Sequence, residues 1–208
     1  MERRFAARHF VDLLQRIDAE LEKPITVVAI GGAVLGLTCL DEYVTTDLDV
    51  ISTREPAFWS AVDRARAKMA DPPLVQAVSI HQPPYDFEDR LTPFPIPGAA
   101  KLTVLIPDLH DVALMKMGRG EEHDLAALEG VHAIRPFSLE QLVSAYVETR
   151  VQYIGRVSEL KLNFLALVAR LFGAGYGGQD RSHARRVSET SCTDRRFPAS
   201  AALAAGAD

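Results

Sequence analysis

Residues 25–50 read ITVVAIGGAVLGLTCLDEYVTTDLDV, and this stretch contains the two patterns that are most informative about the chain. In the first pattern, the apolar run Ile25–Ile30 leads into Gly31 and Gly32 and then into a second apolar segment. This order predicts a buried strand, a tight turn and a helix that the glycines open. Backbone N–H groups at such a turn can face a phosphate group. The glycine pair is therefore interpreted as a phosphate-binding turn, with an ordinary tight turn as the alternative.

The second pattern is the pair Asp47 and Asp49, which one residue separates on a predicted strand. Because side chains alternate between the two faces of a strand, both carboxylates point to the same face. Two like charges a few ångströms apart repel each other, so one tends to stay protonated unless a cation lies between them. Mg²⁺ is usually held by one or two carboxylates together with phosphate oxygens. The two patterns together predict nucleotide chemistry at a metal site, against the alternative of a surface Asp pair.

Length and composition fit one domain of ordinary size, with or without an appendage. The chain has 208 residues, of which 48% are hydrophobic and 25% charged, and its net charge of −5 gives no global attraction to nucleic acid or anionic membrane. Its two cysteines, Cys39 and Cys192, form no metal-ligand cluster, and no disulfide is expected between them. We expect a cytoplasmic protein without a membrane partner, because no run approaches the roughly 18 apolar residues of a membrane span and the N-terminus lacks a signal-peptide core.

Periodicity along the chain predicts an α/β (α+β) fold with a mixed β-sheet, flanking helices and a helical C-terminal region. The expected helices are 5–21, 33–40, 56–69, 107–117, 121–128, 138–150 and 153–172. The expected strands are 25–30, 48–52, 74–80 and 101–106. Residues 81–98 contain five prolines and are expected to form a loop, with one helical turn at 87–91. Residues 174–208 have the composition of a disordered tail.

A second informative block is PDLHDVALMKMGRG at residues 107–120, which Glu121, Glu122, His123 and Asp124 follow. Lys116 and Arg119 are three positions apart on a predicted helix and can lie on one face. Asp124 can pair with either cation and orient it, and an exposed ion pair is the alternative. Lys116 is interpreted as a phosphate contact, with a solvated helix-face lysine as its alternative.

The glycine pair, the motif Thr45-Thr46-Asp47-Leu48-Asp49-Val50 and the 107–124 block together resemble the nucleotidyltransferase superfamily. This superfamily includes DNA polymerase beta, the minimal nucleotidyltransferases and the AbiEii-type toxins. The chain is most similar to the bacterial group DUF6036, over roughly residues 25–130. The resemblance makes residues 1–135 a nucleotidyltransferase-like domain, followed by C-terminal helices at 136–173 and the tail at 174–208.

The resemblance implies transfer of a nucleoside monophosphate from an NTP to an acceptor hydroxyl, with release of pyrophosphate. Asp47 and Asp49 then hold Mg²⁺ and are catalytic together with Lys116. The residues implied to contact the nucleotide are Gly31, Gly32, Thr46, Lys116 and Arg119. The acceptor is RNA such as tRNA, a protein or a small molecule. AbiEii-like relatives further imply a toxin–antitoxin component with a cognate antitoxin.

The sequence departs from the family pattern in ways that leave a second function open. Active members usually carry a third carboxylate on a later core strand, and neither 74–80 nor 101–106 contains an acid. Asp86, Glu88 and Asp89 in the following loop are the candidates for that role. Tyr43 stands where related families often have an arginine. The alternative is a catalytically impaired nucleotidyltransferase fold that binds a nucleotide or a partner. A dinucleotide-binding fold is disfavoured, because the third glycine of its fingerprint is missing.

Overall fold

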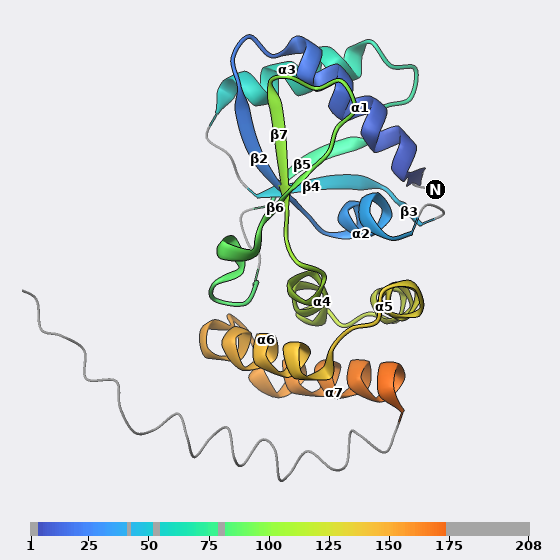
Figure 1. Cartoon of the computed structure of the whole chain (residues 1–208), viewed down its shortest axis with the longest axis vertical. Helices are drawn as coiled ribbons and strands as arrows, with labels where there is room; N and C mark the ends of the chain where they lie inside the picture. The colour runs from blue at the N-terminus through green and yellow to red at the C-terminus, as the bar shows by residue number, and fades with distance from the viewer. Residues whose placement is uncertain (1–3, 41–42, 52–54, 79–81, 174–208) are drawn as a thin grey trace, which may run out of the picture.

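The computed structural model describes residues 4–40, 43–51, 55–78 and 82–173 (Figure 1). The elements run in the order β1 (Phe5–Ala6), α1 (Ala7–Glu20), β2 (Ile25–Ile30), α2 (Gly32–Thr38), β3 (Val44–Thr45), β4 (Asp47–Ile51), α3 (Pro56–Ala67), β5 (Leu74–Val78), η1 (Phe87–Arg90), β6 (Thr92–Phe94), β7 (Leu102–Ile106), α4 (Leu109–Met117), α5 (Glu122–Ile134), α6 (Leu139–Gln152) and α7 (Val157–Phe172). The predicted tail at 174–208, which includes Cys192, lies outside the described residues.

The main sheet has the strand order β5-β4-β2-β7-β6. The central strand β2 runs antiparallel to β4 and parallel to β7, while β5 runs parallel to β4 and β6 antiparallel to β7. This arrangement confirms the predicted α/β (α+β) fold with a mixed sheet and a helical C-terminal region. The two short strands β1 and β3 pair with each other in a separate ribbon.

Three short strands and one helix end differ from the sequence-based prediction. β1 and β3 contain two residues each, too few for a visible period of two, and β6 lies inside the segment expected to be a loop. β6 contains Pro93, which cannot donate to a ladder and is tolerated because β6 is an edge strand. Helix α5 continues to Ile134 rather than ending at Leu128, because Leu128 and Val131 are both fully buried in the core.

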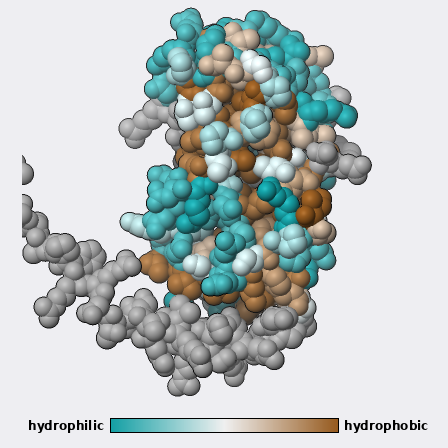
Figure 2. Space-filling model, viewed as in Figure 1, coloured by the Kyte–Doolittle hydropathy of each residue, from teal (hydrophilic) through white to brown (hydrophobic). Residues whose placement is uncertain are grey.

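The helices form layers on either side of the sheet region. α1 and α3 pack together at one end of the molecule, whereas α4 and α5 lie beyond the opposite end of the strands, followed by α6 and α7 (Figure 1). Leu13, Leu14 and Ile17 on α1 are completely buried, as the helical stripe in the sequence predicts. Figure 2 shows hydrophilic residues over α1 and α3 and apolar residues over the strands. None of the described helices is both long and apolar enough to cross a bilayer.

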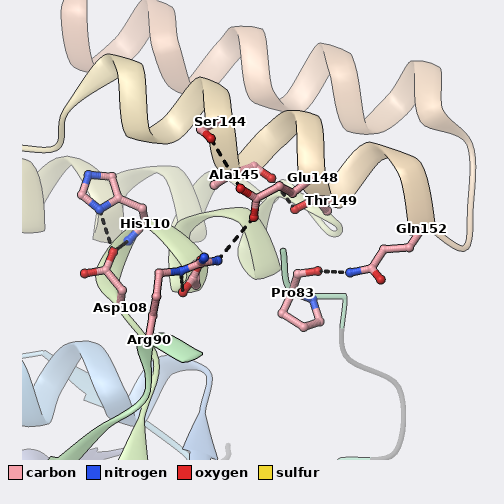
Figure 3. Close-up of polar contacts among 10 residues, drawn as sticks. Pro83, Arg90, Asp108, His110, Ser144, Ala145, Glu148, Thr149 and Gln152 are labelled. Carbon is pink, nitrogen blue, oxygen red and sulfur yellow. Dashed lines mark hydrogen bonds and ion pairs between the residues drawn. The ribbon is translucent and has the colours of Figure 1, made fainter. Parts of the chain in front are cut away.

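Polar contacts attach the C-terminal helices to the segment between β5 and β7 (Figure 3). Arg90 donates to both carboxylate oxygens of Asp111 on α4, at 3.0 and 2.8 Å, and to Glu148 on α6 at 3.4 Å. The Gln152 amide donates to the Pro83 carbonyl at 2.8 Å. These contacts connect α4 and α6 to the sheet region. The domain boundary that the sequence predicts at residue 135 stays a prediction.

Asp18 at the end of α1 is a buried carboxylate whose charge is expected to make stability depend on pH. Its Oδ1 atom accepts backbone N–H bonds from Ala100, Lys101 and Leu102 at 3.0, 2.6 and 2.6 Å. Burial raises the pKa of Asp18, but these three bonds and the Lys101 charge lower it, and the net pKa lies below the ordinary value. A lowered folded-state pKa stabilises the protein above the unfolded value of about 3.9, and this contribution is lost as the pH falls through the folded-state pKa.

We therefore expect Asp18→Asn to lower the free energy of unfolding at pH 7 by about 1 kcal/mol. The variant should also lose less stability than the native protein between pH 4 and lower pH. Urea denaturation across this range checks both expectations. Asp12→Asn is the matched control on the same helix, because Asp12 is half exposed and forms an ion pair with Arg16 one turn away. If the native protein and Asp18→Asn lost the same free energy of unfolding on acidification, the lowered pKa of Asp18 would be contradicted.

Candidate functional site

One cavity of about 580 Å³ brings the predicted site residues together. Its walls include Gly31, Gly32, Thr46, Asp47, Asp49, Lys116 and Arg119. The glycines come from the β2–α2 turn, the aspartates from β4, and the two cations from the end of α4 and the turn that follows it. Segments separated by about seventy residues in the chain therefore face one space, and each segment contributes a different chemical group.

The two carboxylates lie side by side and share a hydrogen-bond donor. Gln76 on β5 is in register with Asp49 on β4, and its Nε2 atom donates to Asp47 Oδ2 at 2.5 Å and to Asp49 Oδ1 at 2.8 Å. The Thr45 hydroxyl lies 3.4 Å from Asp47 Oδ1. A single amide reaches both aspartates only because their side chains leave β4 on the same face, as the one-residue spacing predicts.

The pKa of the Asp49 carboxyl is raised mainly by burial, and the repulsion from Asp47 that the sequence predicts is a smaller cause. Burial raises the pKa of the Asp49 carboxyl, and the nearby charge of Asp47 raises it further. The hydrogen bond from Gln76 and the charges of Lys116 and Arg119 act in the opposite direction, and the net pKa lies above the ordinary value. A divalent cation between the two carboxylates would remove this conflict.

Position 31 requires a glycine because the turn approaches the Asp49 side chain closely. Its φ is +78°, and an added Cβ would lie only 2.5 Å from Asp49 Oδ2. Gly32, the first residue of α2, is also crowded, since an added Cβ would lie 3.0 Å from the Thr45 hydroxyl. The glycine pair therefore lets the backbone N–H groups of the turn and the carboxylates of β4 share one wall of the cavity.

We expect Gly31→Ala to displace the Asp49 carboxylate and to weaken divalent-cation binding at least 10-fold. Gly98 provides a matched control, because its φ of +77° is nearly the same and an added Cβ there meets nothing within 4 Å. Both variants place a side chain at positive φ, which costs about 1–3 kcal/mol, so a comparison of their melting temperatures separates this strain from crowding. Mn²⁺ titration of the two purified variants measures the site itself. Equal Mn²⁺ affinities would show that Gly31 serves only the backbone conformation.

A buried ion-pair cluster lies across the cavity from the carboxylates. Asp124 on α5 is fully buried and accepts from Lys116 Nζ at 2.7 Å and from Arg119 Nε and Nη2 at 2.8 Å each. Burial raises the pKa of Asp124, but the bonds from Arg119 and Lys116 lower it, and the net pKa lies below the ordinary value. Lys116 is only 7% exposed, so it is not the solvated helix-face lysine of the alternative interpretation.

The C-terminal helices hold the segment that carries these cations. The Tyr153 hydroxyl donates to the Gly118 carbonyl at 3.1 Å, and the Asn163 amide donates to the Met117 carbonyl at 3.0 Å. Gly120 has a φ of +64°, and an added Cβ would lie 2.2 Å from the Asn163 side chain. The turn between α4 and α5 is therefore held by Tyr153, which follows α6, and by Asn163 on α7, and these contacts help to set the positions of Lys116 and Arg119.

The structure corrects the prediction about a third carboxylate. Asp86, Glu88 and Asp89 lie at η1, and none of them is among the described residues that line the cavity. Among the described residues, no group of three His, Cys, Asp or Glu side chains is placed to hold a metal ion. The position beside Asp49 on the neighbouring strand holds Gln76 instead, which provides an amide oxygen and an amide nitrogen but no charge.

Several residues of the cavity were missed by sequence reasoning. Gln76, Arg4, Tyr43, Gln82 and His123 all line it. Gln76 had a signal, because it is the one polar residue of the segment Leu74–Val78. Burial raises the pKa of the Tyr43 hydroxyl, which stays protonated near neutral pH. Arg4 and Gln82 lie in segments without a pattern, and His123 belongs to the 107–124 block without being predicted as a site residue, so the three-dimensional fold brings all three to the cavity.

A comparison with known protein families agrees with this geometry. The family described as nucleotidyltransferase of unknown function (DUF6036) matches residues 8–169. The chain belongs to this nucleotidyltransferase family. No curated protein and no solved structure matches it. The DUF6036 match extends from α1 to α7, well beyond the region of roughly 25–130 on which the sequence resemblance rests.

The residues of the DUF6036 cavity fit a divalent cation. The donor set contains two carboxylates, whose oxygen atoms are ligands that Mg²⁺ accepts in proteins, and the amide nitrogen of Gln76 faces both of them. The glycine turn leaves room against Asp49 that a Cβ would fill. Asp47 and Asp49 are the residues that would hold the ion, and Thr45 would orient the first of them.

Proposed function

We propose that this DUF6036 protein is a Mg²⁺-dependent nucleotidyltransferase that transfers a nucleoside monophosphate from an NTP to an acceptor hydroxyl. The observation that carries the proposal is the arrangement of one cavity, in which a carboxylate pair and a buried cation cluster face a glycine turn. A triphosphate needs these three features together, namely a metal site, fixed positive charges and backbone N–H donors.

The charges of the cavity explain why a metal belongs to this function. Asp47 and Asp49 repel phosphate oxygens, whereas Arg4, Lys116 and Arg119 attract them. The charge of Asp124 offsets one of the three cations, so the protein alone has little net attraction for a triphosphate. Mg²⁺ held by the two aspartates would reverse the sign on that side of the cavity and bridge to phosphate oxygens.

The chemistry assigns a role to each group of residues. The acceptor hydroxyl oxygen forms a bond to the α-phosphorus, the bond to the β-phosphate oxygen breaks, and pyrophosphate leaves with that electron pair while the hydroxyl proton passes to solvent. Lys116 and Arg119 stabilise the negative charge that develops on the phosphate oxygens. Gly31 and Gly32 let the backbone approach the triphosphate, and Thr46 on the same wall contacts the nucleotide.

The biological setting follows from the resemblance to polymerase-beta-like and AbiEii-type proteins. We propose a toxin–antitoxin component whose activity a cognate antitoxin restrains. The acceptor is RNA such as tRNA, a protein or a small molecule. This setting is supported by the resemblance to AbiEii-type proteins alone, because the residues of the cavity do not themselves indicate it.

A second candidate function is nucleotide or partner binding without transfer. One specific observation favours it, namely that Gln76 stands beside Asp49 where a third carboxylate is missing. A site with two carboxylates holds less charge and has less capacity to organise metal ions around a triphosphate. Turnover separates this alternative from the first proposal.

The experiment incubates the full chain with each α-labelled NTP and Mg²⁺ in total cell RNA and protein. Asp47→Asn/Asp49→Asn is the control variant, because it keeps side-chain size and removes both charges. Label transferred by the native chain and lost in the control establishes the activity and identifies the acceptor class. Mg²⁺-dependent NTP binding without transfer supports the binding-only function. If the native chain shows neither NTP binding nor transfer of the label, both proposed functions are wrong.

A further inference from the structure

Within the described part of the chain, Gln76 is the side chain that hydrogen-bonds to both proposed metal ligands. Gln76 on β5 is in register with Asp49 on the parallel neighbour β4, and its Nε2 atom donates to Asp47 and Asp49 at 2.5 and 2.8 Å. Carboxylates accept hydrogen bonds and donate none, so the nitrogen end of the amide must face them.

The other end of this amide is available. Among the described residues, no hydrogen bond to the Oε1 atom of Gln76 is present, and both bonds of its side chain involve Nε2. A half-turn about the last side-chain bond exchanges nitrogen and oxygen without moving the strand. Such a turn gives up two hydrogen bonds to carboxylates, and it exposes an uncharged oxygen to the space between Asp47 and Asp49.

We propose that Gln76 is a third ligand of the divalent-cation site and binds the ion through Oε1 after this half-turn. The proposal rests on the proposed function, because it assigns Asp47 and Asp49 as the other ligands. A cation between the carboxylates repels the N–H end of the amide and attracts its carbonyl end. The same side chain therefore joins the carboxylates through nitrogen and completes the cation site through oxygen.

The charge of this ligand set determines how many ions the site holds. Two carboxylates and one neutral amide carry a charge of −2, which a single divalent cation balances. A carboxylate in place of Gln76 would raise this charge to −3 and strengthen binding, since affinity for such ions follows the ligand charge. Gln76 thus makes this a single-ion site of moderate affinity in the absence of nucleotide.

The test measures Mn²⁺ binding to the full chain without nucleotide, by the electron paramagnetic resonance signal of the free ion. The native chain should bind one Mn²⁺. Gln76→Leu should weaken binding about 10-fold, because it removes the oxygen and keeps the apolar stem. Gln76→Glu should tighten it about 10-fold. Asp47→Asn is the control that locates the ion and should lose binding.

The outcomes separate this inference from the proposed function. If Gln76→Leu binds Mn²⁺ as tightly as the native chain or more tightly, the amide only joins the carboxylates, and the inference fails while the metal site stands. If the native chain binds no Mn²⁺, both the inference about Gln76 and the proposed metal-dependent function fail. If Gln76→Leu does not fold, Gln76→Glu still decides, because unchanged or weaker binding in that variant contradicts an oxygen ligand at this position.

Discussion

Replacing Asp124 with leucine is expected to lower the free energy of unfolding by about 3–5 kcal/mol. Asp124 is fully buried and is the counter-charge of Lys116, whose side chain is only 6% exposed. Without the carboxylate, the ammonium group stays in a poorly solvated place with no ion-pair partner of its own. The loss of Asp124 affects Arg119 less, because the Arg119 side chain is 56% exposed and water can solvate its charge. Urea denaturation at pH 7 measures the loss.

The double variant Lys116→Met/Asp124→Leu separates the structural role of this pair from its proposed role in binding. Removing both charges takes away the unpaired group, so most of the lost stability should return. Binding of NTP in the presence of Mg²⁺ should remain at least 10-fold weaker, since the proposed contact of Lys116 with the phosphates is removed. A double variant that regains both stability and NTP affinity would show that Lys116 only neutralises Asp124.

The sequence predicted the wall of the site that is built from adjacent segments. The run Ile25–Ile30, the glycines and the Asp47–Asp49 pair each have a local signature, because burial, turn conformation and strand alternation depend on near neighbours. The mixed sheet followed from the order of these signatures. The Lys116–Asp124 block was also found, although its burial was not, since periodicity does not say whether an ion pair faces solvent.

Contacts between segments that lie far apart in the sequence could not be predicted from the sequence. The acids that follow the expected third strand in the sequence are Asp86, Glu88 and Asp89, whereas the strand itself contains Gln76, which is uncharged and gives no signal of a carboxylate. The position of Gln76 depends on the pairing of β4 with β5, and a strand sequence does not state its partner or register. The two-residue strands β1 and β3 show no periodicity for the same physical reason, because tertiary pairing alone forms them.

The contact of Arg90 with Asp111 is expected to contribute nearly as much stability as the Asp124 cluster. Replacing Arg90 with leucine should lower the free energy of unfolding by about 3 kcal/mol. The reason is that Asp111 is only 1% exposed, and its bidentate partner at 3.0 and 2.8 Å is Arg90. The second contact of Arg90, with the half-exposed Glu148 at 3.4 Å, is worth much less.

Glu148→Gln is accordingly the matched control, and it should change the free energy of unfolding by less than about 0.5 kcal/mol. Arg90→Leu/Asp111→Leu should recover most of the stability that Arg90→Leu loses, because it removes the buried charge that was left alone. Asp111 lies on the same helix as Lys116, so Arg90→Leu should also weaken Mg²⁺-dependent NTP binding, whereas Glu148→Gln should not. Equal losses in the two single variants would mean that solvent reaches Asp111. The position of α4 would then depend on its apolar packing rather than on this ion pair.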